Sequence, residues 1–167
     1  MRRIFMLVIL ATLLTSGCTA QDCPQCQLKK FYNRYLELSC PPQGQYPSYE
    51  EMQQLLKQHL TPKLYSAWEA SHDSESDHWI DYDMFIQGQD CWPGIHIKDM
   101  AHIEGTQWYE IWVVQEGSEN DNRRVFFHLT KDKEQWLIDC IDDGYNRLGD
   151  APASEDKALK NSPDYQK

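Results

Sequence analysis

The sequence predicts a single α+β domain in which helices come first and an antiparallel sheet follows. Up to about residue 70, apolar residues recur every three to four positions, which is the spacing of an amphipathic helix. After about residue 80 the spacing changes to two, the period of a half-buried strand. Helices grouped ahead of consecutive strands favour the α+β class over alternating βαβ units. We expect this domain to occupy residues 26–145.

Three helices are predicted at the start of the domain. Residues 26–39 carry one apolar stripe of leucine, phenylalanine and tyrosine side chains. Ser48, with Glu51 three positions later, forms a capping box that predicts the start of a second helix. Thr61 followed by a proline predicts the start of a third. The polar segment 71–78 then indicates a loop.

The strands are predicted from period-two alternation between glycines. They lie near residues 80–87, 95–104, 107–115, 124–130 and 135–142. Residues 146–167 are polar and have no useful apolar period, so we expect them to form a flexible C-terminal tail.

The N-terminus has the pattern of a secretory signal. A basic head, Met1-Arg2-Arg3, precedes an apolar run at 4–14 and small residues before Cys18. The run is shorter than the roughly 20 residues that a bilayer-spanning helix needs. One interpretation is an ordinary secretory peptide followed by a chance cysteine.

The segment TSGC at 15–18 resembles the lipobox of bacterial lipoproteins, although threonine stands where leucine is usual. The resemblance implies that residues 1–17 are a cleaved signal peptide, that Cys18 becomes an acylated N-terminus, and that residues 18–25 tether the domain to the membrane. Thr19, rather than aspartate, implies the outer membrane of a Gram-negative cell, with the domain facing the periplasm. More than one acyl chain gives a stable anchor.

Composition limits the possible partners. The chain has 16 basic and 26 acidic residues and a formal net charge of −10. Loss of Arg2 and Arg3 with the signal peptide changes that charge to −12. Nucleic acid phosphates require lysine and arginine, so no nucleic acid partner is expected, and adhesion to anionic lipid is disfavoured for the same reason. An acidic surface suits either solubility alone or a basic protein partner.

Three segments carry a resemblance to known families. The order and spacing of QLKKFYNRYLEL in the first helix and QWLIDCIDD in the last strand resemble the cone fold of the nuclear transport factor two-like (NTF-like) superfamily. Between them, DYDMFIQGQD resembles a segment of a bacterial domain-of-unknown-function (DUF) family that includes small envelope lipoproteins. The resemblance implies helices packed on a curved sheet around a pocket. It implies no reaction, because the superfamily contains both enzymes and non-catalytic binders.

Besides Cys18, the sequence has five cysteines: Cys23, Cys26, Cys40, Cys91 and Cys140. The periplasm is oxidising, so disulfides are expected, and an odd count leaves one thiol over. The connectivity does not follow from the sequence. Cys23 and Cys26 have the spacing of a thioredoxin-type dithiol, but no βαβ unit surrounds them. We therefore favour structural bridges, and one from Cys23 or Cys26 to Cys40, Cys91 or Cys140 would pin the N-terminal segment to the domain.

Aspartates and histidines on the predicted strands are candidates for acid–base catalysis in a cone pocket. They are Asp81, Asp83, Asp90, Asp99, His102, His128 and Asp139. Strand alternation favours a solvated face instead. In the segment 95–104 it places the isoleucines with Ala101 on one face, and His96, Lys98 and His102 with Met100 on the other.

The histidines do not predict a metal site. His96 and His102 lie about 20 Å apart along one strand, too far to share an ion. His102 and His128 could approach each other across strands, but no third ligand is evident. No phosphate-binding loop or hydrolase motif occurs, so we expect no metal and no cofactor.

Six tryptophans are present, and most are expected in the core. Trp92 is the exception, because it lies in a glycine-flanked loop where it could anchor a partner or cap the core.

We predict an outer-membrane-anchored, non-catalytic binding or accessory module with an envelope protein partner. The alternatives are an immunity or inhibitor protein against a basic toxin or hydrolase, and a small-molecule-binding protein or acid–base enzyme. An open pocket with converging aspartate and histidine favours the enzyme, and a filled pocket disfavours it.

Overall fold

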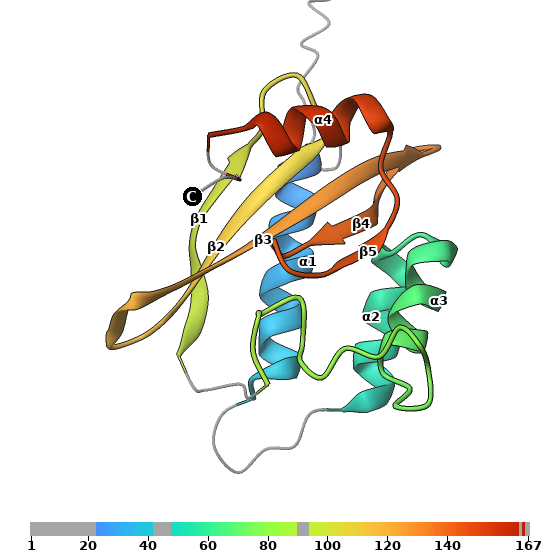
Figure 1. The fold of residues 1–167 in the computed structure, drawn as a ribbon. Helices are drawn as coiled ribbons and strands as arrows, with labels where there is room; N and C mark the ends of the chain where they lie inside the picture. Colours follow the sequence, from blue (N-terminus) through green and yellow to red (C-terminus); the bar gives the residue numbers. More distant parts are fainter. Residues whose placement is uncertain (1–22, 42–47, 90–93, 164, 166–167) are drawn as a thin grey trace, which may run out of the picture.

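The computed structural model describes residues 23–41, 48–89, 94–163 and 165 (Figure 1). Within these ranges the chain forms four helices and five strands. The helices are α1 (Pro24–Ser39), α2 (Tyr49–His59), α3 (Pro62–Ser71) and α4 (Ala153–Asn161). The strands are β1 (Ile95–His102), β2 (Trp108–Gln115), β3 (Ser118–Asp132), β4 (Gln135–Asp142) and β5 (Arg147–Gly149).

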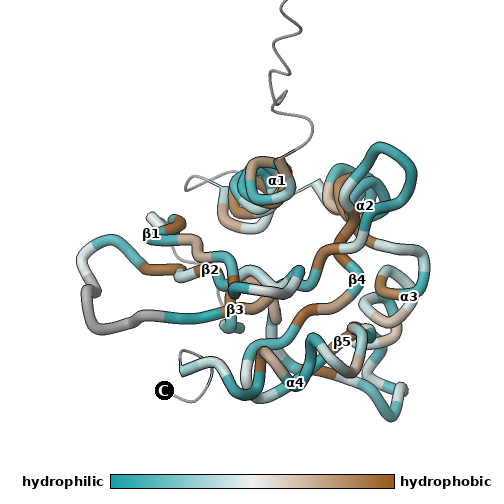
Figure 2. Tube along the Cα trace, turned by 90° about the horizontal axis from the view of Figure 1, so that it is seen from above, coloured by the Kyte–Doolittle hydropathy of each residue, from teal (hydrophilic) through white to brown (hydrophobic). Residues whose placement is uncertain are grey.

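The strands form one antiparallel sheet in sequence order, β1-β2-β3-β4-β5. Helices α1 and α2 lie over one face of the sheet and α4 lies across the other, so the sheet is the middle of three layers (Figures 1 and 2). Helix α3 packs at the end of the sheet, where it contacts β4 and β5. The α+β class predicted from the sequence is confirmed, and four of the predicted strands correspond to β1–β4.

The starts of α2 and α3 are set by their capping side chains. The Ser48 hydroxyl accepts a hydrogen bond from the backbone N–H of Glu51 at 3.3 Å. The Thr61 hydroxyl accepts one from the backbone N–H of Leu64, also at 3.3 Å. Each cap satisfies a donor that the first helical turn leaves without a partner, and such a cap contributes about 1 kcal/mol. Both predicted helix starts are confirmed.

Aromatic rings fill the space between α1 and the sheet. Phe31, Tyr32 and Tyr35 of α1 pack around Phe85 and Phe127. The ring centroids of Tyr35 and Phe85 are 4.4 Å apart, and those of Tyr32 and Phe127 are 5.6 Å apart. A hollow beside Phe31, between α1 and the sheet, has a volume of only about 10 Å³, roughly the space that one water molecule requires. This layer is a packed core.

A second, smaller apolar cluster lies on the opposite face of the sheet. Trp108, Phe126 and Cys140 of the sheet contact Leu159 of α4 there. Leu159 has no exposed surface. The sheet is therefore covered on both faces at this point, which explains why β2 carries apolar residues on both of its sides.

The strand predicted at 80–87 is wrong. These residues form turns with one isolated bridge, between Asp83 and Gly88. The Asp83 carboxylate accepts a hydrogen bond from the backbone N–H of Phe85 at 2.8 Å, which closes a local turn. Three consecutive apolar residues, 84–86, are all buried, so they fill the core from a loop instead of alternating between two faces.

The flexible tail expected at 146–167 is also wrong for most of its length. Strand β5 pairs with β4 through Leu148 opposite Ile141, and α4 then folds back across the sheet (Figure 1). The polar composition of this segment predicted a tail because α4 has only one buried residue, Leu159. The helix is held mainly by polar side chains, which a search for an apolar period does not detect.

Strand β1 departs from simple alternation at one position. The register with β2 shifts between Ile97 and Asp99, which marks a bulge. Ile95, Ile97 and Met100 consequently pack together against the main core, whereas Ala101 is exposed. The predicted faces hold before the bulge and are wrong for Met100 and Ala101 after it.

Candidate functional site

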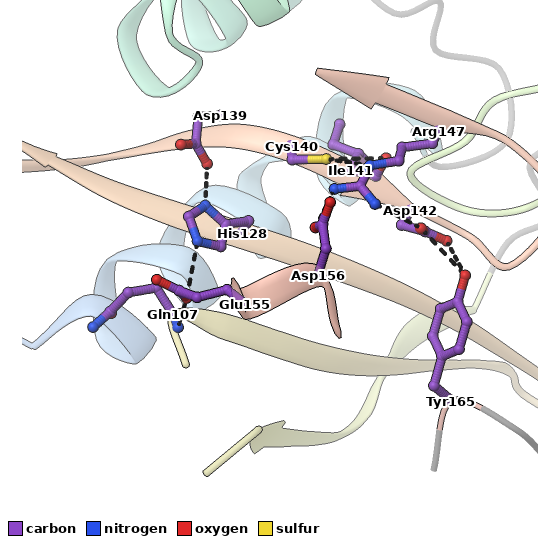
Figure 3. A network of polar contacts seen from close by, with 10 residues as sticks. All are labelled: Gln107, His128, Asp139, Cys140, Ile141, Asp142, Arg147, Glu155, Asp156 and Tyr165. Carbon is purple, nitrogen blue, oxygen red and sulfur yellow. Dashed lines mark hydrogen bonds and ion pairs between the residues drawn. The ribbon is translucent and has the colours of Figure 1, made fainter. Parts of the chain in front are cut away.

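A network of polar side chains joins α4 to the outer face of the sheet (Figure 3). We call it the α4 network; its members are His128, Asp139, Arg147, Glu155 and Asp156. The His128 side chain from β3 is almost fully buried. Its Nδ1 lies 2.5 Å from Asp139 Oδ1, and its Nε2 lies 3.1 Å from Glu155 Oε2. Figure 3 shows the imidazole between the two carboxylates, with Asp139 on the sheet and Glu155 on α4.

A β-bulge supplies the first of these carboxylates. In the pairing of β3 with β4, His128 lies opposite Cys140 and Leu129 lies opposite Ile138, so Asp139 is an extra residue on β4. Such a bulge changes the direction of a side chain relative to simple alternation. Here it brings Asp139 onto the same face as His128, beneath α4.

Gly149 of β5 allows the bulge to be covered closely. It lies opposite Cys140 and has a φ of 82°. A Cβ at this position would lie 2.1 Å from the backbone oxygen of Asp139. Glycine is therefore required at position 149 for two reasons: its positive φ is unfavourable for other residues, and the neighbouring strand lies too close for a Cβ.

The contacts of His128 define its protonation state. An ionised carboxylate only accepts hydrogen bonds, so the imidazolium form, which donates from both ring nitrogens, is the form of His128 that satisfies both contacts. Burial alone lowers the pKa of His128, but the hydrogen bonds and charges of Asp139 and Glu155 outweigh it and raise the pKa above its usual value. His128 is thus a buried cation that joins the sheet to the first turn of α4.

Arg147 makes the second connection to α4. Its guanidinium lies 2.5 Å from Asp156 Oδ1, and its Nε lies 3.2 Å from Cys140 Sγ. It also lies over the ring of Trp108, with 5.4 Å to the centroid. Burial raises the pKa of the Cys140 thiol to about 12 despite the neighbouring Arg147, so this free cysteine stays protonated and is a poor nucleophile at neutral pH.

The α4 network has no open position for a substrate as it stands. Both ring nitrogens of His128 are occupied, and Glu155 Oε2 also accepts the backbone N–H of Gln107 at 2.5 Å. Acid–base chemistry at His128 would require α4 to leave the sheet. In the closed form shown in Figure 3, the network holds the helix in place.

His102 and His128, which the sequence allowed to approach each other across strands, are separated. His102 is on β1 and pairs with Tyr109 of β2, whereas His128 is on β3 and pairs with Trp108. A strand therefore lies between them, which corresponds to about 10 Å. His102 Nε2 instead contacts the backbone oxygen of Thr106 at 2.6 Å. Among the described residues, no group of three His, Cys, Asp or Glu side chains could hold a metal ion.

The remaining acid–base candidates are dispersed. Asp81 and Asp99 are exposed. Asp83 belongs to the 80–88 loop, and its Oδ2 accepts a hydrogen bond from the Tyr35 hydroxyl of α1 at 2.6 Å. Burial raises the pKa of Asp83 even though hydrogen bonds from Tyr35 and from the loop backbone favour its charged form. Asp83 therefore fastens a loop to α1 and does not converge with His102 or His128.

Four positions named from the sequence, Cys18, Asp90, Cys91 and Trp92, lie outside the described residues. Of the other cysteines, Cys23 and Cys26 form a disulfide with each other. The expected bridge from this pair to the body of the domain is therefore wrong. Cys23 is also the N-cap of α1, since its sulfur accepts the backbone N–H of Cys26 at 3.1 Å. Cys40 is disulfide-bonded as well, and Cys140 is a buried free thiol.

Hollows lined by described residues open at the surface in two places. The larger, of about 800 Å³, lies between the α2–α3 junction and the β3–β4 hairpin and includes Lys57, Tyr65 and Asp132. The smaller, of about 370 Å³, lies between α3, residues 77–80 and β5. Trp79 lines the smaller hollow with half of its surface exposed. We did not single out Trp79 in the sequence, although its position directly after the polar run 71–78 distinguishes it from the tryptophans on strands.

Comparison with known proteins gives no match: no family model, no curated protein and no solved structure matches the chain. The interpretation of its function therefore depends on its own residues. None of the helices within the described ranges is long and apolar enough to cross a membrane.

Proposed function

We propose that the protein is an outer-membrane-anchored periplasmic lipoprotein that acts as a non-catalytic binding or accessory module of the cell envelope. The observation that carries the non-catalytic part is the packed layer between α1 and the sheet, where rings from both sides leave a hollow of about 10 Å³. The saturated contacts of His128 support it further, because neither ring nitrogen is open to a substrate.

The proposal includes the cone-like architecture of the NTF-like superfamily. Three helices followed by an antiparallel meander agree with that architecture in order and class. In a cone fold the helices and the concave side of the sheet enclose a pocket, and here aromatic side chains occupy the corresponding layer. A binding role then depends on the outer surface of the domain. Membership of a DUF family of envelope lipoproteins is part of the same proposal.

The anchoring part is supported by the sequence at Cys18 and by where the helices begin. Because α1 already begins at Pro24, five residues, 19–23, separate the proposed lipid from the first helix of the domain. Five extended residues reach at most about 18 Å. The domain would therefore stay close to the membrane, which raises its effective concentration near membrane-bound partners.

A second candidate function is an immunity or inhibitor protein against a basic toxin or hydrolase. The observation that favours it is the exposed acidic loop at 72–81, which contains four carboxylates and no lysine or arginine. An immunity or inhibitor protein would be one kind of binding module, and the proposed lipid anchor at Cys18 applies to it as well.

The anchor is tested by fractionation of three forms of the full chain. The native protein is expected in the outer membrane, Cys18→Ala in the soluble periplasm, and Thr19→Asp in the inner membrane if the aspartate sorting rule applies. Circular dichroism of Cys18→Ala should match that of the native domain, because the described core is formed by residues from Leu28 onward. Intact mass of the native protein should show acyl chains. Recovery of Cys18→Ala in the membrane fraction would contradict the anchor.

A further inference from the structure

Two exposed aromatic side chains, Trp79 and Tyr145, lie on segments that border one surface hollow. Within the described residues, the exposed large apolar side chains are Tyr49, Trp79 and Tyr145, with 66%, 53% and 89% of their surface accessible. Trp79 lines the hollow of about 370 Å³, and Tyr145 adjoins Asn146, which lines the same hollow. Exposed tryptophan and tyrosine beside a concave surface are typical of the residues that dominate protein–protein binding energy.

The loop and the turn that carry these rings are held together. The Tyr82 hydroxyl donates a hydrogen bond to Asp143 Oδ2 at 2.5 Å, and Asn146 Nδ2 donates one to the Tyr82 oxygen at 2.6 Å. Asp143 Oδ1 in turn accepts the backbone N–H groups of Tyr145 and Asn146, at 2.9 and 2.7 Å. The two segments are therefore fixed relative to each other before any partner arrives, which reduces the entropy lost on binding.

The surroundings of the hollow are negatively charged. Asp73, Glu75, Asp77 and Asp81 in the loop are all exposed, and the segment 72–81 has no lysine or arginine. No ion pair between described residues involves any of the four. Among the described residues that line the hollow, Arg147 is the one lysine or arginine, and its guanidinium is ion-paired with Asp156 and Asp142. The hollow is thus lined by the Trp79 ring and the Asp77 carboxylate, and the other three exposed carboxylates lie on the same loop.

We infer that this Trp79–Tyr145 surface, formed by residues 72–81 and 143–149, docks a lysine- or arginine-bearing segment of a protein partner. Cationic side chains are attracted to aromatic faces, most strongly to tryptophan, and to the nearby carboxylates. Anionic lipid and nucleic acid would be repelled by the same charges. The inference rests on the proposed function of a binding module, and it assigns the partner chemistry and the surface.

Photocrosslinking in the lipidated full chain tests the surface directly. p-Benzoylphenylalanine is placed in turn at Trp79 and Tyr145, and at two matched exposed positions elsewhere, Tyr49 on α2 and Glu104 in the β1–β2 turn. We expect a protein adduct from positions 79 and 145 at least fivefold stronger than from 49 and 104. The crosslinked partner peptide, sequenced by mass spectrometry, should carry a net positive charge.

A charge variant separates docking at this surface from simple proximity. Asp77→Asn combined with Asp81→Asn should reduce the adduct at position 79 at least fivefold. The matched variant, Glu104→Gln combined with Glu134→Gln, removes two exposed carboxylates from distant turns and should leave the adduct unchanged. Equal adducts at all four positions, a neutral or acidic partner peptide, a lipid adduct, or no adduct at 79 and 145 would each overturn the inference.

Fractionation distinguishes this failure from failure of the anchor. If the protein fractionates with the outer membrane but gives no adduct at 79 and 145, the surface assignment is wrong and the anchor stands. If Cys18→Ala stays in the membrane while the adducts form as expected, the anchor is wrong and the surface stands.

Discussion

His128 Nε2 lies 3.1 Å from Glu155 Oε2, and this contact joins the third strand of the sheet to the last helix of the chain. On the opposite side of the same ring, Asp139 lies 2.5 Å from Nδ1. The ring can satisfy both carboxylates only while both nitrogens carry a proton. The docking of α4 is therefore coupled to the protonation of one buried residue.

The first prediction concerns the pH dependence of α4 docking. The folded pKa of His128 is raised above 6.5, so the stabilisation by its charged form is complete below about pH 6.5 and is lost as the pH rises through the raised value. The neutral ring directs a lone pair at one carboxylate, which removes a charge-assisted hydrogen bond of about 1.5–3 kcal/mol. The protection factors of the amides at 153–161, which are exchange rates normalised to the base-catalysed intrinsic rate at each pH, should fall roughly tenfold or more between acidic and alkaline pH.

Two variants check that His128 is the responsible group. His128→Gln should remove the pH dependence of the protection factors in α4, whereas His96→Gln, which changes an exposed histidine on β1, should retain it. Glu155→Gln removes one of the two charges facing the ring and should lower the pKa of His128, as followed by NMR titration. A native His128 that titrates at or below its ordinary pKa would contradict the interpretation of the α4 network.

The second prediction compares two glycines with the same backbone conformation. Gly149 and Gly144 have φ values of 82° and 85°, but only Gly149 has a backbone atom within reach of an added Cβ, the oxygen of Asp139 at 2.1 Å. Gly144→Ala should cost about 1–2 kcal/mol from conformation alone. Gly149→Ala should cost about 3 kcal/mol or more, because β5 must also move away from the bulge.

Urea denaturation of both variants measures this difference. The free energy of unfolding should fall by clearly more for Gly149→Ala, and the pKa of His128 should fall with it, because the bulge positions Asp139. Equal losses of unfolding free energy in the two variants would show that the close approach of Gly149 to Asp139 does not affect stability.

Features set by neighbouring residues were predictable from the sequence. The capping hydroxyls of Ser48 and Thr61 act within three residues, so their motifs identify the starts of α2 and α3. Strand β4 was placed correctly at 135–142 from its alternation. The period-two pattern at 80–87 predicted a strand wrongly. The Asp83 carboxylate accepts a hydrogen bond from the backbone N–H of Phe85, which forms a turn, and the three adjacent apolar residues 84–86 are all buried.

Features set by distant residues were not predictable. The bulge at Asp139 is visible only in the register between two strands, and it alone places the carboxylate beside His128. Helix α4 has one buried residue, and its docking depends on Glu155 and Asp156 meeting partners that are 27 and 9 positions earlier in the chain. The Trp79–Tyr145 surface likewise joins segments more than 60 residues apart. No pattern within either segment reveals such a pairing.

The third prediction concerns the disulfide between Cys23 and Cys26. Because it closes a loop of only four residues, the loss of unfolded-state entropy corresponds to about 2 kcal/mol. The double variant Cys23→Ser/Cys26→Ala should lose about this amount of unfolding free energy, yet keep its fold, since a serine at 23 can still cap α1. Tryptic mapping without reductant should give one peptide through Lys29 with both cysteines and a mass 2 Da below the dithiol form. A peptide that links either cysteine to Cys40 or Cys140 would contradict the structure, and an unfolded double variant would show that this short bridge stabilises far more than its own loop.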